Sequence, residues 1–133
     1  MKELSKPWKI AVIVLRTLMG LIFIASSVVV LFGAVEPPAD MPERAKTFQA
    51  GMEATGYMLY LIKVTELLCG ILLVSGLYVA LSALIIFPIT LNIFLYHVFV
   101  LPDGLPVAIF LLAVNLILAY VHRDSYRPLF RRK

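Results

Sequence analysis

Four apolar stretches, each long enough to cross a lipid bilayer, constrain the fold of this chain most strongly. They run over about residues 10–33, 57–79, 82–101 and 105–121. A helix of about 20 apolar residues spans the hydrocarbon core, and membrane-spanning backbone must satisfy its own hydrogen bonds. Hydrophobic residues make up 62% of the 133 residues and charged residues only 15%. We therefore predict an all-α integral membrane four-helix bundle that forms a single domain over residues 1–133.

The distribution of charge predicts the orientation of the chain. Basic residues gather before the first span and after the last one, namely Lys2, Lys6, Lys9, Arg123, Arg127, Arg131, Arg132 and Lys133. The 34–56 connection holds Arg44 and Lys46 among four acidic residues. Lys and Arg accumulate on the cytoplasmic side of membrane proteins. We therefore expect a multi-pass protein of the cell (inner) membrane, with both termini cytoplasmic and a short extracytoplasmic helix in the connection.

Several classes of function are disfavoured by composition. The formal net charge is +4, but the basic residues lie beside apolar spans, so we expect no binding of nucleic acid. Cys69 is the only cysteine, which excludes an intramolecular disulfide and a cysteine-held iron–sulfur cluster. We expect Cys69 to pack as a small apolar residue. His97 and His122 lie at opposite ends of the bundle, and the acidic residues are dispersed, so neither a bis-histidine haem nor a metal site is expected.

Each predicted span places one strongly polar residue at a similar depth: Arg16, Glu66, Asn92 and Asn115. Charged groups inside a bilayer are costly, so they are usually paired and often functional. Counting about 1.5 Å per residue places all four roughly 9–18 Å from the cytoplasmic side. We therefore predict a buried Arg16–Glu66 ion pair with two amides around it. The sequence leaves two uses open: an interhelical clasp, or a site for a ligand or a proton.

Lys63 and His97 lie toward the outer side of the same spans. Lys63 is one turn from Glu66 and two turns from the outer end, so we expect it to snorkel outward. Five residues separate Asn92 from His97, a rotation of about 140°, so the two do not share a face. We expect His97 either to form a hydrogen bond within the bundle or to face an outward-opening cavity.

Small residues accompany the charged ones at helical spacing. Arg16, Gly20, Phe23 and Ser27 form one stripe, and Lys63, Glu66 and Gly70 form another. Small residues on such stripes let membrane helices approach closely. We expect these two faces to contact each other.

Five short segments carry a resemblance to a known family. They are residues 15–23 (LRTLMGLIF), 55–57 (TGY), 65–70 (TELLCG), 88–93 (PITLNI) with His97, and 126–130 (YRPLF). Together they resemble the DoxX family, in particular its branch of small four-span proteins. The resemblance implies that Arg16, Glu66, Asn92 and His97 are signature polar positions. In one departure, Ser26-Ser27-Val28 stands where the first helix of the family commonly ends in a Gly followed by a Lys.

The resemblance also suggests a function. The family's name comes from a subunit of a thiosulfate:quinone oxidoreductase, and relatives are implicated in oxidative-stress complexes. We expect an accessory subunit of a redox-linked membrane complex, whose polar core and aromatic residues bind a small ligand with an apolar body, such as a quinone. Quinone carbonyls accept hydrogen bonds from Arg, Asn and His. No covalent cofactor is expected.

Distant animal relatives act as receptor-assembly chaperones, which gives an alternative function. In that case the chain is a chaperone or scaffold without catalytic activity. It would bind a protein partner, or a second copy of itself, through the 34–56 connection and the basic tail. A proton-coupled transporter is a third hypothesis, but the chain lacks the duplicated halves of many carriers. Whether the protein is an enzyme stays open.

Overall fold

The computed structural model describes residues 4–33 and 40–132, and within them the regular structure is entirely helical. Four described helices are long and apolar enough to cross a membrane. They are α1 (Lys6–Leu31), α3 (Met58–Ser75), α4 (Val79–Phe99) and α5 (Leu105–Val121), the last preceded by the 3-10 turn η1 (Pro102–Gly104). The shorter elements are α2 (Glu43–Ala54), α6 (Arg123–Tyr126) and η2 (Arg127–Phe130). The prediction of an all-α membrane bundle is confirmed.

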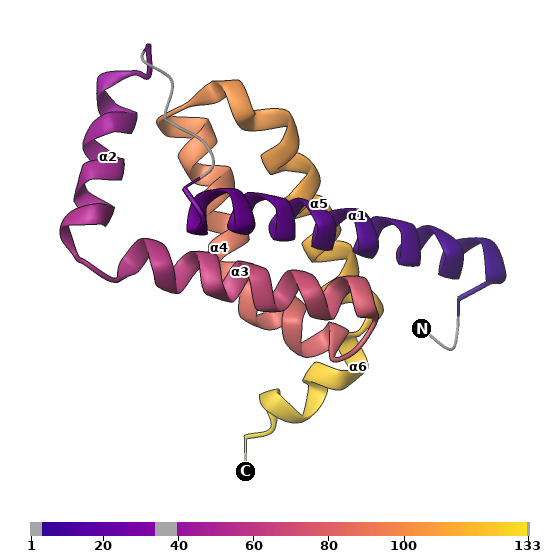
Figure 1. The fold of residues 1–133 in the computed structure, drawn as a ribbon. Coiled ribbons are helices and arrows are strands. Elements are labelled where there is room, and N and C mark those ends of the chain that lie inside the picture. The colour runs from indigo at the N-terminus through magenta and orange to yellow at the C-terminus, as the bar shows by residue number, and fades with distance from the viewer. Residues whose placement is uncertain (1–3, 34–39, 133) are drawn as a thin grey trace.

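Helices α1 and α3 run side by side in opposite directions, and so do α4 and α5 (Figure 1). Helix α1 contacts α3 and α5, and α4 contacts the same two helices. The start of α1, the α3–α4 turn and the C-terminal segment lie at one end of the bundle, which we call the basic end (Figure 1). Helix α2 and η1 lie at the opposite end, which we call the α2 end. Residues 34–39 of the connection fall outside the described residues.

Helix α1 is longer than its neighbour α3, and this difference sets the depth of Arg16. It begins at Lys6, four residues before the expected start, with Pro7 in its first turn. It has 26 residues against 18 in α3, so it is longer by roughly 12 Å. Its first turns therefore extend past the α3–α4 turn (Figure 1).

The α3–α4 turn follows the break expected at Ser75-Gly76. Gly76 adopts a left-handed conformation, with φ of 79°, and its N–H donates to the carbonyl oxygen of Leu72 at 3.0 Å. This is a common helix C-terminus, where glycine avoids the steric cost of a Cβ. Leu77 and Tyr78 on the turn are largely exposed.

The bundle core is apolar and lies between all four long helices. Its fully buried members include Met19 and Phe23 on α1, Leu73 on α3, Ile86 on α4 and Leu118 on α5. Cys69 is buried in the same cluster, so its predicted role as a small packed residue is confirmed.

At the α2 end, α2 begins immediately after Pro42 and is mostly exposed. It reaches the bundle through an aromatic contact: the rings of Phe48 and Tyr96 have centroids 5.0 Å apart. At the basic end, the hydroxyl of Tyr126 donates to the carbonyl oxygen of Ala80 at 2.5 Å. This bond holds the C-terminal segment beside the start of α4.

Candidate functional site

A buried ion pair lies halfway along α3, in its interface with α1. The ammonium of Lys63 is 3.0 Å from Oε2 of Glu66, one turn away on the same helix. The same ammonium donates to Oγ of Ser26 at 3.0 Å. Oγ of Ser27 donates to Glu66 at 3.4 Å. We call these four residues the mid-span cluster; its charged members come from α3 and its hydroxyls from α1.

Two glycines bring α1 and α3 close enough for these contacts. A Cβ placed on Gly20 would lie 2.7 Å from the carbonyl oxygen of Gly70, and one on Gly70 would lie 2.8 Å from that of Gly20. Backbone therefore touches backbone at this crossing. Gly20 lies about two turns from Ser27 on α1, and Gly70 lies about one turn from Glu66 on α3. The crossing therefore fixes the register between Ser27 and Glu66. The expected contact between the two small-residue stripes is confirmed.

The predicted Arg16–Glu66 pair is wrong. Arg16 lies against the α3–α4 turn, where Cζ of its guanidinium would be 3.3 Å from a Cβ on Gly76. Its Nε is buried and has no hydrogen-bond partner. Among the described residues, the ion pair of Glu66 is with Lys63. Because α1 extends past the turn, Arg16 lies level with the end of α3 and not with its middle.

Lys63 also differs from its expected position. It was expected to snorkel outward, but it turns toward Ser26 and Glu66, and its side chain is 15% exposed. Three residues along a helix bring side chains onto neighbouring positions, so this pair needs no cross-helix register. The ammonium has three donors, of which two are used in the cluster.

The two amides do not surround the ion pair. Asn92 is exposed on α4 and donates to the carbonyl oxygen of Pro88 at 2.9 Å, on its own helix. Asn115 is fully buried between α5 and α4, where its Nδ2 donates to the carbonyl oxygen of Ala83 at 3.1 Å. Its Oδ1 is buried without a partner, as is Oγ of Ser82. The predicted polar slab shared by four helices is therefore wrong.

His97 is engaged at the α2 end of α4. Its Nδ1 lies 2.8 Å from the carbonyl oxygen of Leu101, and its ring packs against Gly104 of η1. A T-shaped contact with Tyr96, with centroids 5.1 Å apart, completes its surroundings. Of the two expectations for His97, the structure supports a hydrogen bond within the bundle.

The serines of the mid-span cluster were not identified as site residues from the sequence. Ser27 belongs to the predicted small-residue stripe of α1. The sequence, however, predicts that Glu66 pairs with Arg16, so it does not indicate that Ser27 donates to Glu66. Ser26 lies one position off that stripe, and it is reached only because the side chain of Lys63 is long. No group of three His, Cys, Asp or Glu residues that could hold a metal ion occurs in the described part of the chain.

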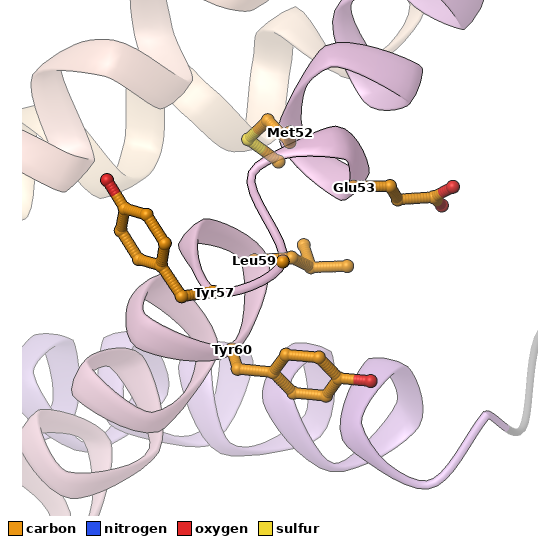
Figure 2. Close-up of a pocket in the computed structure, with 6 residues that line it drawn as sticks. Met52, Glu53, Tyr57, Leu59 and Tyr60 are labelled. Atoms are coloured by element: carbon orange, nitrogen blue, oxygen red, sulfur yellow. The ribbon is translucent and has the colours of Figure 1, made fainter.

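A pocket of about 210 Å³ lies at the α2 end, in the corner between α2 and α3 (Figure 2). It is lined by Met52, Glu53, Gly56, Tyr57, Leu59 and Tyr60. Figure 2 shows Tyr57 and Tyr60 turned to opposite sides, with Leu59 on the side of Tyr60. Leu59 and Lys63 are four residues apart on α3, so they share a helix face. The pocket therefore lies about one turn beyond the mid-span cluster.

Comparison with known proteins gives one positive result. No curated protein and no solved structure matches the chain. The DoxX family model matches residues 11–98, which include most of α1, all of α2 and α3, and nearly all of α4. This match covers well over half of the 133 residues. The chain therefore belongs to the DoxX family of membrane proteins.

Proposed function

We propose that this protein binds a quinone-type ring from the bilayer, as an accessory subunit of a redox-linked membrane complex. The observation that carries the proposal is the position of Lys63. Its ammonium has a donor left after the contacts with Ser26 and Glu66, and its side chain is partly accessible. A quinone carbonyl is an acceptor that needs such a donor. In this proposal Lys63 donates the hydrogen bond to the quinone carbonyl that the sequence predicts for Arg16 and Asn92.

The pocket between α2 and α3 is large enough for a quinone ring but not for a whole quinone with its tail. Its volume of about 210 Å³ is below the roughly 300–1,000 Å³ of sites for drug-sized ligands. Leu59, Tyr57 and Tyr60 supply an apolar and aromatic wall. In this proposal the isoprenoid tail stays in lipid, and the electrons are carried by the quinone and a partner subunit.

The test is to purify the protein in mild detergent, extract the bound lipids and assay them for quinone. A short-tailed quinone is then added during thermal unfolding. We expect a rise in the melting temperature of the wild type that is lost in Lys63→Met and in Leu59→Trp, which fills the pocket. Arg16→Gln is the matched control and should keep the rise. No quinone in the extract and no rise in the wild type would contradict the proposal.

A scaffold or chaperone role is the second candidate, and it is favoured by the burial of the mid-span cluster. Glu66 is only 2% exposed, and its carboxylate already accepts hydrogen bonds from Lys63 and Ser27. If the cluster is only a clasp, function depends on α2 and the basic C-terminal segment. Crosslinking in native membranes discriminates: a partner kept in Glu66→Gln but lost on removal of residues 127–133 supports this role.

We also propose that the basic end faces the cytoplasm of the cell membrane, because Lys and Arg accumulate on that side. The test is labelling of introduced cysteines in intact cells with an impermeant thiol reagent. Lys46→Cys on α2 and Ser125→Cys on α6 are suitable, since both positions are exposed while the native Cys69 is buried. Labelling at 46 alone is expected, and labelling at 125 alone would reverse the orientation.

A further inference from the structure

Arg16 is a partly buried cation held in a fixed place at the basic end. Its guanidinium lies over Gly76, with Cζ and Nη2 at 3.3 and 3.5 Å from where a Cβ would be. Gly76 has a positive φ of 79°, which a glycine adopts without strain. Both the backbone conformation and the missing Cβ of this residue therefore leave room for the guanidinium.

The charge of Arg16 has no partner within the described chain. Its Nε is buried and donates no hydrogen bond, and the described ion pairs do not include it. Among the described acidic residues, Glu66 is paired at mid-span, and Asp124 is paired with Arg127 at 3.2 Å. The end of α3 offers only its partial negative charge.

The surroundings of Arg16 lie at the end of the apolar helix α3 and carry positive charge. The neighbouring turn exposes 60% of Leu77 and 71% of Tyr78, and tyrosines are enriched at membrane interfaces. The Tyr126–Ala80 hydrogen bond brings the C-terminal segment, with its arginines, to the same end (Figure 1). The start of α1 adds Lys6 and Lys9. An anion at this end meets several cations.

We infer that Arg16 binds the phosphate of one anionic phospholipid beside the α3–α4 turn, in the leaflet at the basic end. The guanidinium presents planar, paired N–H donors that match phosphate oxygens. The lipid supplies the negative charge that the described chain does not place there. The lipid is favoured over free phosphate because the exposed Leu77 and Tyr78 offer apolar surface for its acyl chains and glycerol.

The experiment is native mass spectrometry of the full chain titrated with phosphatidylglycerol, with thermal unfolding measured in parallel. Phosphatidylcholine and inorganic phosphate are the comparison additions. We expect one phosphatidylglycerol to bind most tightly, with Arg16→Gln weakening that binding about tenfold or more, as for loss of a charge-assisted hydrogen bond. The control Lys46→Gln removes an exposed charge on α2, at the opposite end of the bundle, and should change the affinity less than about twofold.

Each outcome decides the proposal. Equal affinities in Arg16→Gln and Lys46→Gln would show that the guanidinium only caps α3, and would overturn the proposal. An equal rise in melting temperature with inorganic phosphate would overturn the assignment to a lipid. If Arg16→Gln does not fold, Arg16→Lys decides, because it keeps the charge but loses the planar pair of donors. A severalfold weaker affinity is then expected, and an unchanged affinity would overturn the proposal.

Discussion

Lys63 and Arg16 both lie in the interface between α1 and α3, yet their charges are compensated in different ways. At mid-span, Lys63 is bonded to Glu66 and Ser26 within the chain. At the basic end, Arg16 has no ion-pair partner among the described residues. Hydrocarbon offers no counter-charge, whereas the headgroup region offers phosphate and water. We infer that depth in the membrane decides whether the chain must supply the partner itself.

The largest expected effect comes from removing one member of the mid-span pair. Lys63→Met leaves the carboxylate of Glu66, which is 2% exposed, with only Ser27 as a donor. We expect the free energy of unfolding in detergent micelles to fall by roughly 3–5 kcal/mol, as for other buried pairs that lose one partner. Lys46→Met on the exposed face of α2 is the control and should change it by less than about 0.5 kcal/mol. A similar small change for both would mean that the pair does not exist.

The next effect concerns the glycine crossing that sets the depth of both cations. In Gly70→Ala the new Cβ would lie 2.8 Å from the carbonyl oxygen of Gly20 and 2.9 Å from Cγ1 of Ile24. Backbone cannot yield as a side chain can, so we expect a loss of about 1–3 kcal/mol. Gly51→Ala meets nothing within 4 Å and should be neutral or stabilising by up to about 1 kcal/mol. Equal stability of the two variants would show that α1 and α3 do not touch here.

A smaller effect is expected at the basic end, where Tyr126 anchors the C-terminal segment. Burial raises the pKa of Tyr126 above its ordinary value, so the neutral hydroxyl that donates to Ala80 is favoured in the folded state. The stabilisation is complete below the ordinary pKa of about 10 and is lost as the pH rises through the raised value. We expect tryptic cleavage after Arg123, in the same segment, to increase over that range. Tyr126→Phe should be cleaved roughly fivefold faster already at neutral pH, because it loses a hydrogen bond that contributes about 1 kcal/mol. A wild-type cleavage rate independent of pH would contradict the role of Tyr126 as an anchor.

The smallest effect is expected at Asn115, a buried polar residue without a charge. Its Nδ2 donates to Ala83, but its Oδ1 has no partner. Replacing such a group by an apolar one of similar shape is often nearly neutral. We expect Asn115→Leu to change the free energy of unfolding by less than about 1 kcal/mol. A loss near that of Lys63→Met would mean that Asn115 takes part in the polar interior after all.

The sequence predicts the helices and their contact faces well. Long apolar stretches give the four spans because the bilayer admits few other structures. The Ser75-Gly76 break marks the α3–α4 turn because glycine tolerates a positive φ. Gly20 and Gly70 mark the α1–α3 contact because small residues at helical spacing are needed for close approach.

The positions of the polar side chains were predicted less well, for two physical reasons. Counting residues assumes that all spans start at one level, but α1 extends past the α3–α4 turn, which moves Arg16 away from Glu66. Helix α4 carries apolar residues on every face, so the sequence does not show which face is buried. Asn92 can then face outward because its amide bonds to the carbonyl of Pro88.

The pairing within the mid-span cluster is tested most directly by two double-mutant cycles that share Glu66→Gln. One combines it with Lys63→Met and the other with Arg16→Gln, and each compares free energies of unfolding in detergent micelles. We expect the first double variant to recover part of the loss caused by Lys63→Met, with a coupling of about 1–3 kcal/mol, and the second pair to add within about 0.5 kcal/mol. Strong coupling of Arg16 to Glu66 and additive effects for Lys63 would contradict the account.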